Sequence, residues 1–191
     1  MPMIRECIVT TIDLAGAIHL APLGIIEDDQ RWIIAPFHPS RTLDNLRAVP
    51  FATASFTDDV RIFAGCLTGR RDWPLAPCEG WPVPRLADCL AHMALRVAEV
   101  AEDAQRPRFA CDVLAHVAHR PFAGFNRAQS AVIEAAILAS RLHMLPRERI
   151  EAEMAIHRSA LLKTAGPREL EAWRWLDEKI ASHWAADAAK A

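Results

Sequence analysis

The sequence changes character near residue 120, and this change constrains the fold more than any other feature. Before it, short β-prone runs alternate with turn-forming residues, and most of the 13 prolines lie there. After it, long stretches rich in Ala, Leu, Glu and Arg carry apolar residues at helical spacing. Strands followed by helices are typical of an α+β chain. We therefore expect a β domain over residues 1–120 and a helical subdomain over residues 121–191.

Six strands are expected in the N-terminal part, from its β-branched and aromatic runs and the turns between them. The first three predict an antiparallel meander, and the last two predict a long hairpin, although the alanines of its first arm favour a helix. Residues 73–84 contain five prolines or glycines and predict irregular structure. Asp58 and Asp59 predict the start of a short helix. The expected strands cover residues 4–12, 17–26, 31–35, 51–56, 89–102 and 108–119.

Three helices are expected in the C-terminal part. Asn126 with Gln129 resembles a capping box for the first, which extends to about residue 145. Pro146 fits the first turn of the second helix, Gly166 ends it in a left-handed conformation, and Pro167 begins the third. These helices either pack on the β domain or form a dimer contact or a lid. Their expected buried stripes are Ile150, Met154, His157 and Leu161, and Leu170, Trp173, Leu176, Ile180 and Trp184.

Charge and cysteine content argue against several classes of protein. The formal net charge of -2 gives no electrostatic basis for binding nucleic acid or an anionic membrane. The sequence lacks a run of about 18 uncharged apolar residues, and its N-terminus does not resemble a signal peptide. The five cysteines are odd in number, widely spaced and without a Cys-x-x-Cys pair. This pattern predicts reduced thiols and a cytoplasmic protein.

Residues 36–46 form the clearest candidate site. A strand is expected to end here and a short helix to begin, so that unpaired backbone N–H groups and the helix dipole attract a phosphate. Ser40 and Thr42 supply hydroxyl donors, Arg41 supplies a fork-shaped cation, and Asn45 supplies an amide. The residues alone leave an alternative open, in which Ser40 only caps a surface helix and Arg41 is solvated.

The same segment carries a family resemblance. The run Pro-x-x-x-Ser-x-Thr-x-x-Asn-Leu, from Pro36 to Leu46, resembles the phosphate-binding corner of FMN-binding split-barrel proteins of the flavin-reductase type. Further segments resemble one functionally unassigned group of these proteins, associated with tetrahydromethanopterin-linked one-carbon metabolism. They are the runs at residues 4–11, 19–24, 63–74, 124–128 and 163–169, so the resemblance covers nearly the whole chain.

The resemblance implies a six-stranded antiparallel split β-barrel that forms a homodimer, with one FMN in each of two clefts between the subunits. It implies two groups of cofactor-binding residues, one at the phosphate and ribityl chain and one along the edge of the isoalloxazine ring. The first group is Ser40, Arg41, Thr42 and Asn45, and the second is Pro36 and Thr57.

Two functions of different classes agree with this resemblance. The first is an FMN-dependent oxidoreductase linked to one-carbon or pterin metabolism, acting on a small-molecule substrate. The second is a flavin- or other cofactor-binding module without turnover, such as a carrier, sensor or assembly factor. Split barrels also hold haem and deazaflavins, so the sequence leaves the ligand open among these three.

Other polar clusters are weaker candidates. Asp58-Asp59 suits a helix cap better than a catalytic pair, because adjacent residues in a strand point to opposite faces. The run Arg70-Arg71-Asp72-Trp73 either grips an anionic substrate or pairs internally. His116 and His119 are split between the two faces of a strand that also carries Cys111, so no metal site is predicted there. No catalytic residue is predicted.

Overall fold

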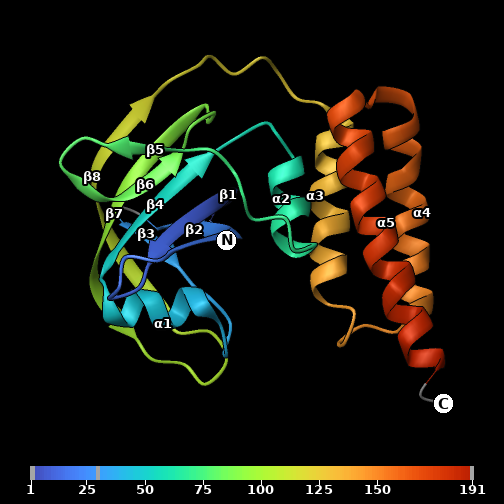
Figure 1. Cartoon of the computed structure of the whole chain (residues 1–191), viewed down its shortest axis with the longest axis horizontal. Helices are drawn as coiled ribbons and strands as arrows, with labels where there is room; N and C mark the ends of the chain where they lie inside the picture. Colours follow the sequence, from blue (N-terminus) through green and yellow to red (C-terminus); the bar gives the residue numbers. More distant parts are fainter. Residues whose placement is uncertain (1–2, 29–30, 190–191) are drawn as a thin grey trace. The chain divides into compact units, whose positions relative to one another are not determined.

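The computed structural model of the chain describes residues 3–28 and 31–189, and these form two compact units (Figure 1). One unit contains Met1–Thr57 and Trp73–Phe122, and the other contains Asp58–Asp72 and Ala123–Ala191. From the sequence, residues 58–72 were expected in the N-terminal domain, but in the structure they group with the C-terminal helices. The chain therefore leaves the β unit after residue 57 and returns to it at residue 73.

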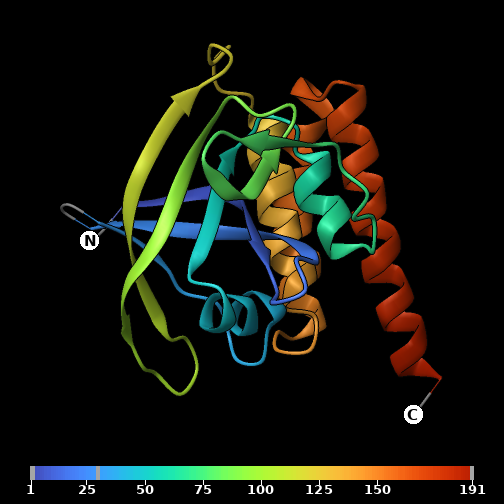
Figure 2. The ribbon, with the colours of Figure 1, turned by 60° about the vertical axis from the view of Figure 1, so that its left-hand side comes forward.

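The β unit is a closed barrel of six antiparallel strands in the order β1-β2-β3-β8-β7-β4. This confirms the expected six-stranded barrel and α+β class. The alanine-rich β7 is a strand because Met93 and Leu95 alternate into the core while the strand pairs with both β4 and β8 (Figure 2). The six strands are β1 (Met3–Ile12), β2 (Ile18–Asp28), β3 (Arg31–Ile34), β4 (Phe51–Phe56), β7 (Ala91–Ala101) and β8 (Arg108–Ala118).

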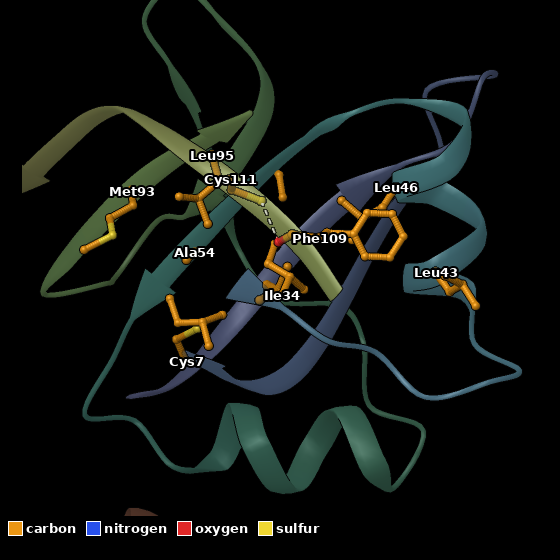
Figure 3. Packing of buried hydrophobic residues seen from close by; sticks show 12 residues of the cluster. Cys7, Ile34, Leu43, Leu46, Ala54, Met93, Leu95, Phe109 and Cys111 are labelled. Carbon is orange, nitrogen blue, oxygen red and sulfur yellow. Dashed lines mark hydrogen bonds between the residues drawn. The ribbon is translucent and has the colours of Figure 1, made fainter. Parts of the chain in front are cut away.

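The barrel interior is filled by apolar side chains from alternate strand positions. Val9, Ile25 and Phe109 are completely buried there. The helix α1 (Arg41–Ala48) adds Leu43 and Leu46 to the same cluster (Figure 3). Each buried leucine stabilises the folded chain by roughly 1.5–3 kcal/mol, so these two side chains fix the helix firmly against the barrel.

The proline-rich segment at residues 73–84 has regular structure. Residues 73–84 were predicted to lack regular structure, yet a two-stranded sheet of β5 (Leu75–Cys78) and β6 (Trp81–Leu86) lies there. It is tied to β4, because Thr53 Oγ1 donates a 2.8 Å hydrogen bond to the carbonyl of Val83 and Ser55 Oγ accepts one of 3.1 Å from the N–H of Leu86. Two-stranded edge sheets tolerate proline, which explains the error.

The helical unit consists of α2 (Arg61–Leu67), α3 (Arg127–Ser140), α4 (Arg147–Thr164) and α5 (Pro167–Ala188). Asn126 caps α3, and Pro167 is the first residue of α5, as expected. Two details differ: α3 ends at Ser140 instead of near residue 145, and Gly166 is extended, with φ of -95°, instead of left-handed. Within the described residues, none of the helices has the length and apolar composition of a membrane span.

The predicted apolar stripes are largely buried. Ile150, Met154 and Leu161 of α4 are buried, and so are most stripe residues of α5. Leu170 is an exception, because half of its surface is exposed, and His157 and Trp184 are only half-buried. All five cysteines are buried and form no disulfide. Burial raises the pKa of Cys66 to about 11 and of Cys111 to about 12, so these thiols stay protonated at neutral pH.

Candidate functional site

The loop between β3 and α1 brings the expected phosphate-binding residues to one corner of the barrel. Ser40 is the N-cap of α1, and its Oγ accepts a 3.3 Å hydrogen bond from the N–H of Leu43. The Ser40 carbonyl accepts another, of 3.2 Å, from the N–H of Asp44. These contacts satisfy two of the four N–H groups in the first turn. The N–H groups of Arg41 and Thr42 have no acceptor within the helix, because the first turn offers none.

Two side chains add accessible donors to this corner. The Arg41 side chain is 51% exposed, and its Nη2 lies 3.6 Å from Oδ2 of Asp13. Exposed ion pairs contribute little to stability, so this guanidinium can exchange Asp13 for a bound anion. The Ser40 hydroxyl oxygen accepts from Leu43, which leaves its own O–H to donate. The corner therefore presents a cation, a hydroxyl and backbone N–H groups together.

Asp13 is held in place beside Arg41 by its own turn. One of its carboxylate oxygens accepts hydrogen bonds from the N–H groups of Ala15 and Ala17, at 2.9 and 2.8 Å. These bonds, that from Ala17 first, and the nearby Arg41 guanidinium lower the pKa of Asp13 below its ordinary value. Asp13 therefore stays ionised at neutral pH and keeps Arg41 near the helix N-terminus.

Thr42 and Asn45 lie on the buried side of α1. Each is 3% exposed, and the Asn45 side-chain amide donates a 2.9 Å hydrogen bond to Oγ1 of Thr11, which is fully buried at the end of β1. In the chain as described, Asn45 thus joins the helix to the barrel. No local pattern indicates Thr11 as the partner of Asn45, since 34 residues separate the two.

Arg106 holds the loop that precedes α1, and sequence reasoning missed it. Its Nε and Nη2 donate hydrogen bonds of 3.1 and 2.9 Å to the carbonyl of Ala35. Its guanidinium also lies over the ring of Phe37, 4.3 Å from the centroid. The N–H of His38 donates to the carbonyl of Gln105 at 2.9 Å. The β7–β8 turn therefore clamps the loop, and only tertiary structure reveals this contact.

Pro36 and Thr57 lie at different places in the barrel. Pro36 is buried two residues after the end of β3, within the clamped loop. Thr57 is half-buried just beyond β4, whereas Ala52, near the start of that strand, pairs with Thr11 beside α1. Thr57 is five positions after Ala52 along the extended chain, which is roughly 17 Å. Only an extended ligand reaches from the α1 corner to Thr57.

The remaining polar candidates form internal contacts. Nδ1 of His92 on β7 lies 2.8 Å from Nε2 of His119, and their rings stack with centroids 5.1 Å apart. Burial, followed by the neighbouring His119, lowers the pKa of His92.

The polar candidates of the helical unit also form internal contacts. The Arg70 guanidinium lies over the ring of Trp175, 4.4 Å from its centroid. Asp59 accepts from the backbone N–H of Arg61 at 3.1 Å, but the N-cap of α2 is Val60, so neither Asp58 nor Asp59 is the predicted cap. No group of three metal-ligating side chains is arranged for a metal in residues 3–28 and 31–189.

Most of the chain matches one protein family. Residues 5–120 match the N-terminal domain of DUF447, a family of proteins of unknown function, and residues 126–178 match the second domain of that family. The chain belongs to the DUF447 family. No curated protein matches this DUF447 chain.

Solved structures share the fold of this DUF447 chain. An FMN-bound DUF447 protein from Methanosarcina mazei superposes with a TM-score of 0.80 and 19% identity, over 92% of this chain and 94% of that one. A 2-nitrobenzoate 2-nitroreductase from Pseudomonas fluorescens gives 0.51 and 20%, over 62% of this chain and 64% of the other. An NADH:FAD oxidoreductase from Streptomyces globisporus gives 0.51 and 14%, over 62% and 77%. The fold is therefore that of flavin-reductase-like split barrels.

Proposed function

We propose that the chain is an FMN-binding flavoprotein and that the α1 corner holds the phosphate of the cofactor. The observation that carries this proposal is the N-terminus of α1, where Ser40, the exposed Arg41 and two N–H groups without a helical acceptor come together. Such a donor set suits a phosphate dianion, since each contact is a charge-assisted hydrogen bond. The FMN-bound protein from Methanosarcina mazei, which shares the fold, supports the choice of cofactor.

The residues of the proposed site have distinct roles. Arg41 and Ser40 contact the phosphate directly, and the N–H groups of Arg41 and Thr42 donate to it. Asn45 holds the helix against Thr11, so that the first turn of α1 keeps its place. Pro36 and Thr57 would lie along the isoalloxazine ring of the bound cofactor. An extended cofactor accounts for the separation between Thr57 and the helix.

We propose that this flavoprotein is an oxidoreductase acting on a small molecule. Bound FMN supplies transfer of a hydride or of single electrons at its ring. The chain's own residues bind and orient the cofactor, and none of its described side chains is assigned as an acid or base. Among substrates we favour a pterin of the tetrahydromethanopterin type, which rests on the family resemblance alone. The alternative function is a flavin-binding module without turnover.

We also propose that the chain forms a homodimer in the cytoplasm. Beyond Cys111, where β3 ends its pairing, β8 pairs only with β7 among the described strands. In this stretch Leu114 is 51% exposed and Val117 is 42% exposed. An unpaired strand edge with exposed apolar side chains favours a protein partner, and a second copy of the chain is the simplest one. The free, buried cysteines agree with a reducing compartment.

The test begins with protein purified without added cofactor. We expect a flavin absorbance spectrum, and release of FMN on denaturation, identified by mass. A haem spectrum or a deazaflavin mass would contradict the choice of cofactor. Anaerobic mixing with NADH or NADPH then separates the two classes of function: rapid bleaching, followed by reoxidation with a candidate acceptor, supports an oxidoreductase. A bound flavin that no nicotinamide donor reduces supports the binding module.

A further inference from the structure

The helical unit contains a hollow of about 450 Å³ that is lined by residues of this unit alone. It is lined by Arg61 at the start of α2 and by one face of α5 near its N-terminus. A volume of this size lies within the range of small-molecule pockets, which is about 300–1,000 Å³. The other lining residues are Pro167, Arg168, Leu170, Glu171 and Arg174.

Arg61 forms a fixed wall of this hollow. Its Nη2 and Nε donate hydrogen bonds of 2.6 and 2.9 Å to the two carboxylate oxygens of Asp59, whose side chain is 8% exposed. Its Nη1 lies 3.4 Å from Oε2 of Glu171. Burial raises the pKa of Asp59, but the bonds and charge of Arg61 outweigh it, and the net pKa is lowered. Asp59 therefore stays ionised and keeps the guanidinium plane in one orientation.

Arg168 and Arg174 are the adaptable cations of the hollow. Arg168 Nη1 lies 3.8 Å from Asp59, and Arg174 Nε lies 3.9 Å from Glu178. Both contacts are long, and both arginine side chains are more than half exposed, so these ion pairs contribute little. Either guanidinium can turn toward an incoming anion without a large loss of stability.

The position of Arg168 is unfavourable for the helix that carries it. It is the second residue of α5, a helix of 22 residues, where the positive end of the dipole disfavours a cation. Local rules of this kind are most often broken at functional sites. A bound anion would offset this repulsion, because both the helix dipole and the arginines attract it.

We propose that this hollow binds a small anion through its phosphate or carboxylate groups. Arg168 and Arg174 would grip the oxyanion as planar forks, Arg61 would stay on Asp59 as the rigid wall, and the half-exposed Leu170 would contact an apolar part of the ligand. Glu171, which carries a negative charge within the hollow, selects for a ligand whose anionic groups lie toward the arginines. The proposed anion site contains none of the residues of the proposed FMN site.

The test is calorimetric titration of the FMN-saturated full chain with inorganic pyrophosphate and, separately, with citrate, at constant ionic strength. FMN saturation keeps the α1 corner occupied. We expect saturable binding of at least one probe with a Kd tighter than about 1 mM. Arg168→Ala with Arg174→Ala should weaken it about tenfold or more, since charge-assisted hydrogen bonds are lost. Leu170→Glu, which leaves every arginine in place, should weaken it similarly by repulsion.

The matched control is Arg147→Ala with Arg149→Ala, which removes the same charge from exposed positions on α4. It should leave the Kd of the probe within about twofold of wild type, because the removed charges lie outside the hollow and salt screens their effect on it. No saturable binding of either probe up to about 10 mM would overturn the proposal. So would equal weakening by the control, which would indicate attraction by overall charge. Neither result would affect the proposed FMN site.

Discussion

The side-chain amide of Asn45 donates a 2.9 Å hydrogen bond to Oγ1 of Thr11, and both residues are buried. This contact joins the helix whose first turn is the proposed phosphate site to the last residues of β1. The polar contact lies beside the apolar anchors Leu43 and Leu46. The position of the proposed site thus depends on packing inside the barrel.

Asn45→Ala is expected to lower the free energy of unfolding by about 1–3 kcal/mol, because it leaves the buried Thr11 hydroxyl without its donor. Urea unfolding of the cofactor-free chain measures this. Thr11→Val should cost a similar amount, and the double variant should cost less than the sum of the two. Strict additivity of the two changes would show that the contact does not contribute.

Arg106→Ala is expected to loosen the loop that precedes α1, because the Ala35 carbonyl loses two donors and Phe37 loses its cation. Amide hydrogen exchange of Ala35, Phe37, His38 and Ser40 should become at least about tenfold faster, while exchange in β1 and β4 stays unchanged. Arg108→Ala, an exposed arginine two residues away, is the control. Equal amide exchange rates in the two variants would show that Arg106 does not hold the loop.

His92 gives the fold a defined response to mild acid. Burial and His119 lower its pKa in the folded chain, so the unfolded chain binds more protons once the pH falls below the ordinary histidine pKa near 6.5. Stability should therefore fall as the pH is lowered through 6.5 toward the folded-state pKa, by at most about 1.4 kcal/mol per pH unit for this one group. His92→Gln should flatten this slope in urea unfolding at pH 7.5 and 5.5. If the dependence of stability on pH is unchanged in this variant, other titratable groups cause the response to acid.

Leu114→Lys with Val117→Lys is expected to convert the proposed dimer into monomers, because charges on the open part of β8 oppose pairing with a second copy. Light scattering after size exclusion should report one chain mass in place of two. Leu14→Lys places a charge on another leucine, which is 83% exposed, and should leave the dimer intact. A wild-type chain that is already monomeric would overturn the dimer proposal.

The strands of the barrel were predictable because their signals are local. Runs such as residues 4–12 and 31–35 carry β-branched and aromatic residues between turns, and the structure has strands there. The prediction for residues 73–84 was wrong for the opposite reason. Their prolines argue against regular structure, and the hairpin exists through hydrogen bonds to Thr53 and Ser55 on another strand.

The candidate site was predictable only in part. The cap at Ser40 is a local signal, and the structure has it. The partners of Asn45 and of the Ala35 carbonyl lie 34 and 71 residues away, and no local pattern marks Thr11 or Arg106. The grouping of residues 58–72 with the C-terminal helices is likewise a matter of long-range packing, which periodicity does not encode.

A phosphate site at the N-terminus of α1 is tested by fluorescence titration of the cofactor-free chain with FMN and with riboflavin, which differ only in the phosphate. We predict that wild type prefers FMN by about a hundredfold or more, since several charge-assisted hydrogen bonds reach the phosphate. Arg41→Ala should reduce this preference at least about tenfold, whereas Arg47→Ala, which removes an exposed arginine from the last turn of the same helix, should preserve it. Equal affinities of the wild-type chain for FMN and riboflavin would contradict a phosphate site at the N-terminus of α1.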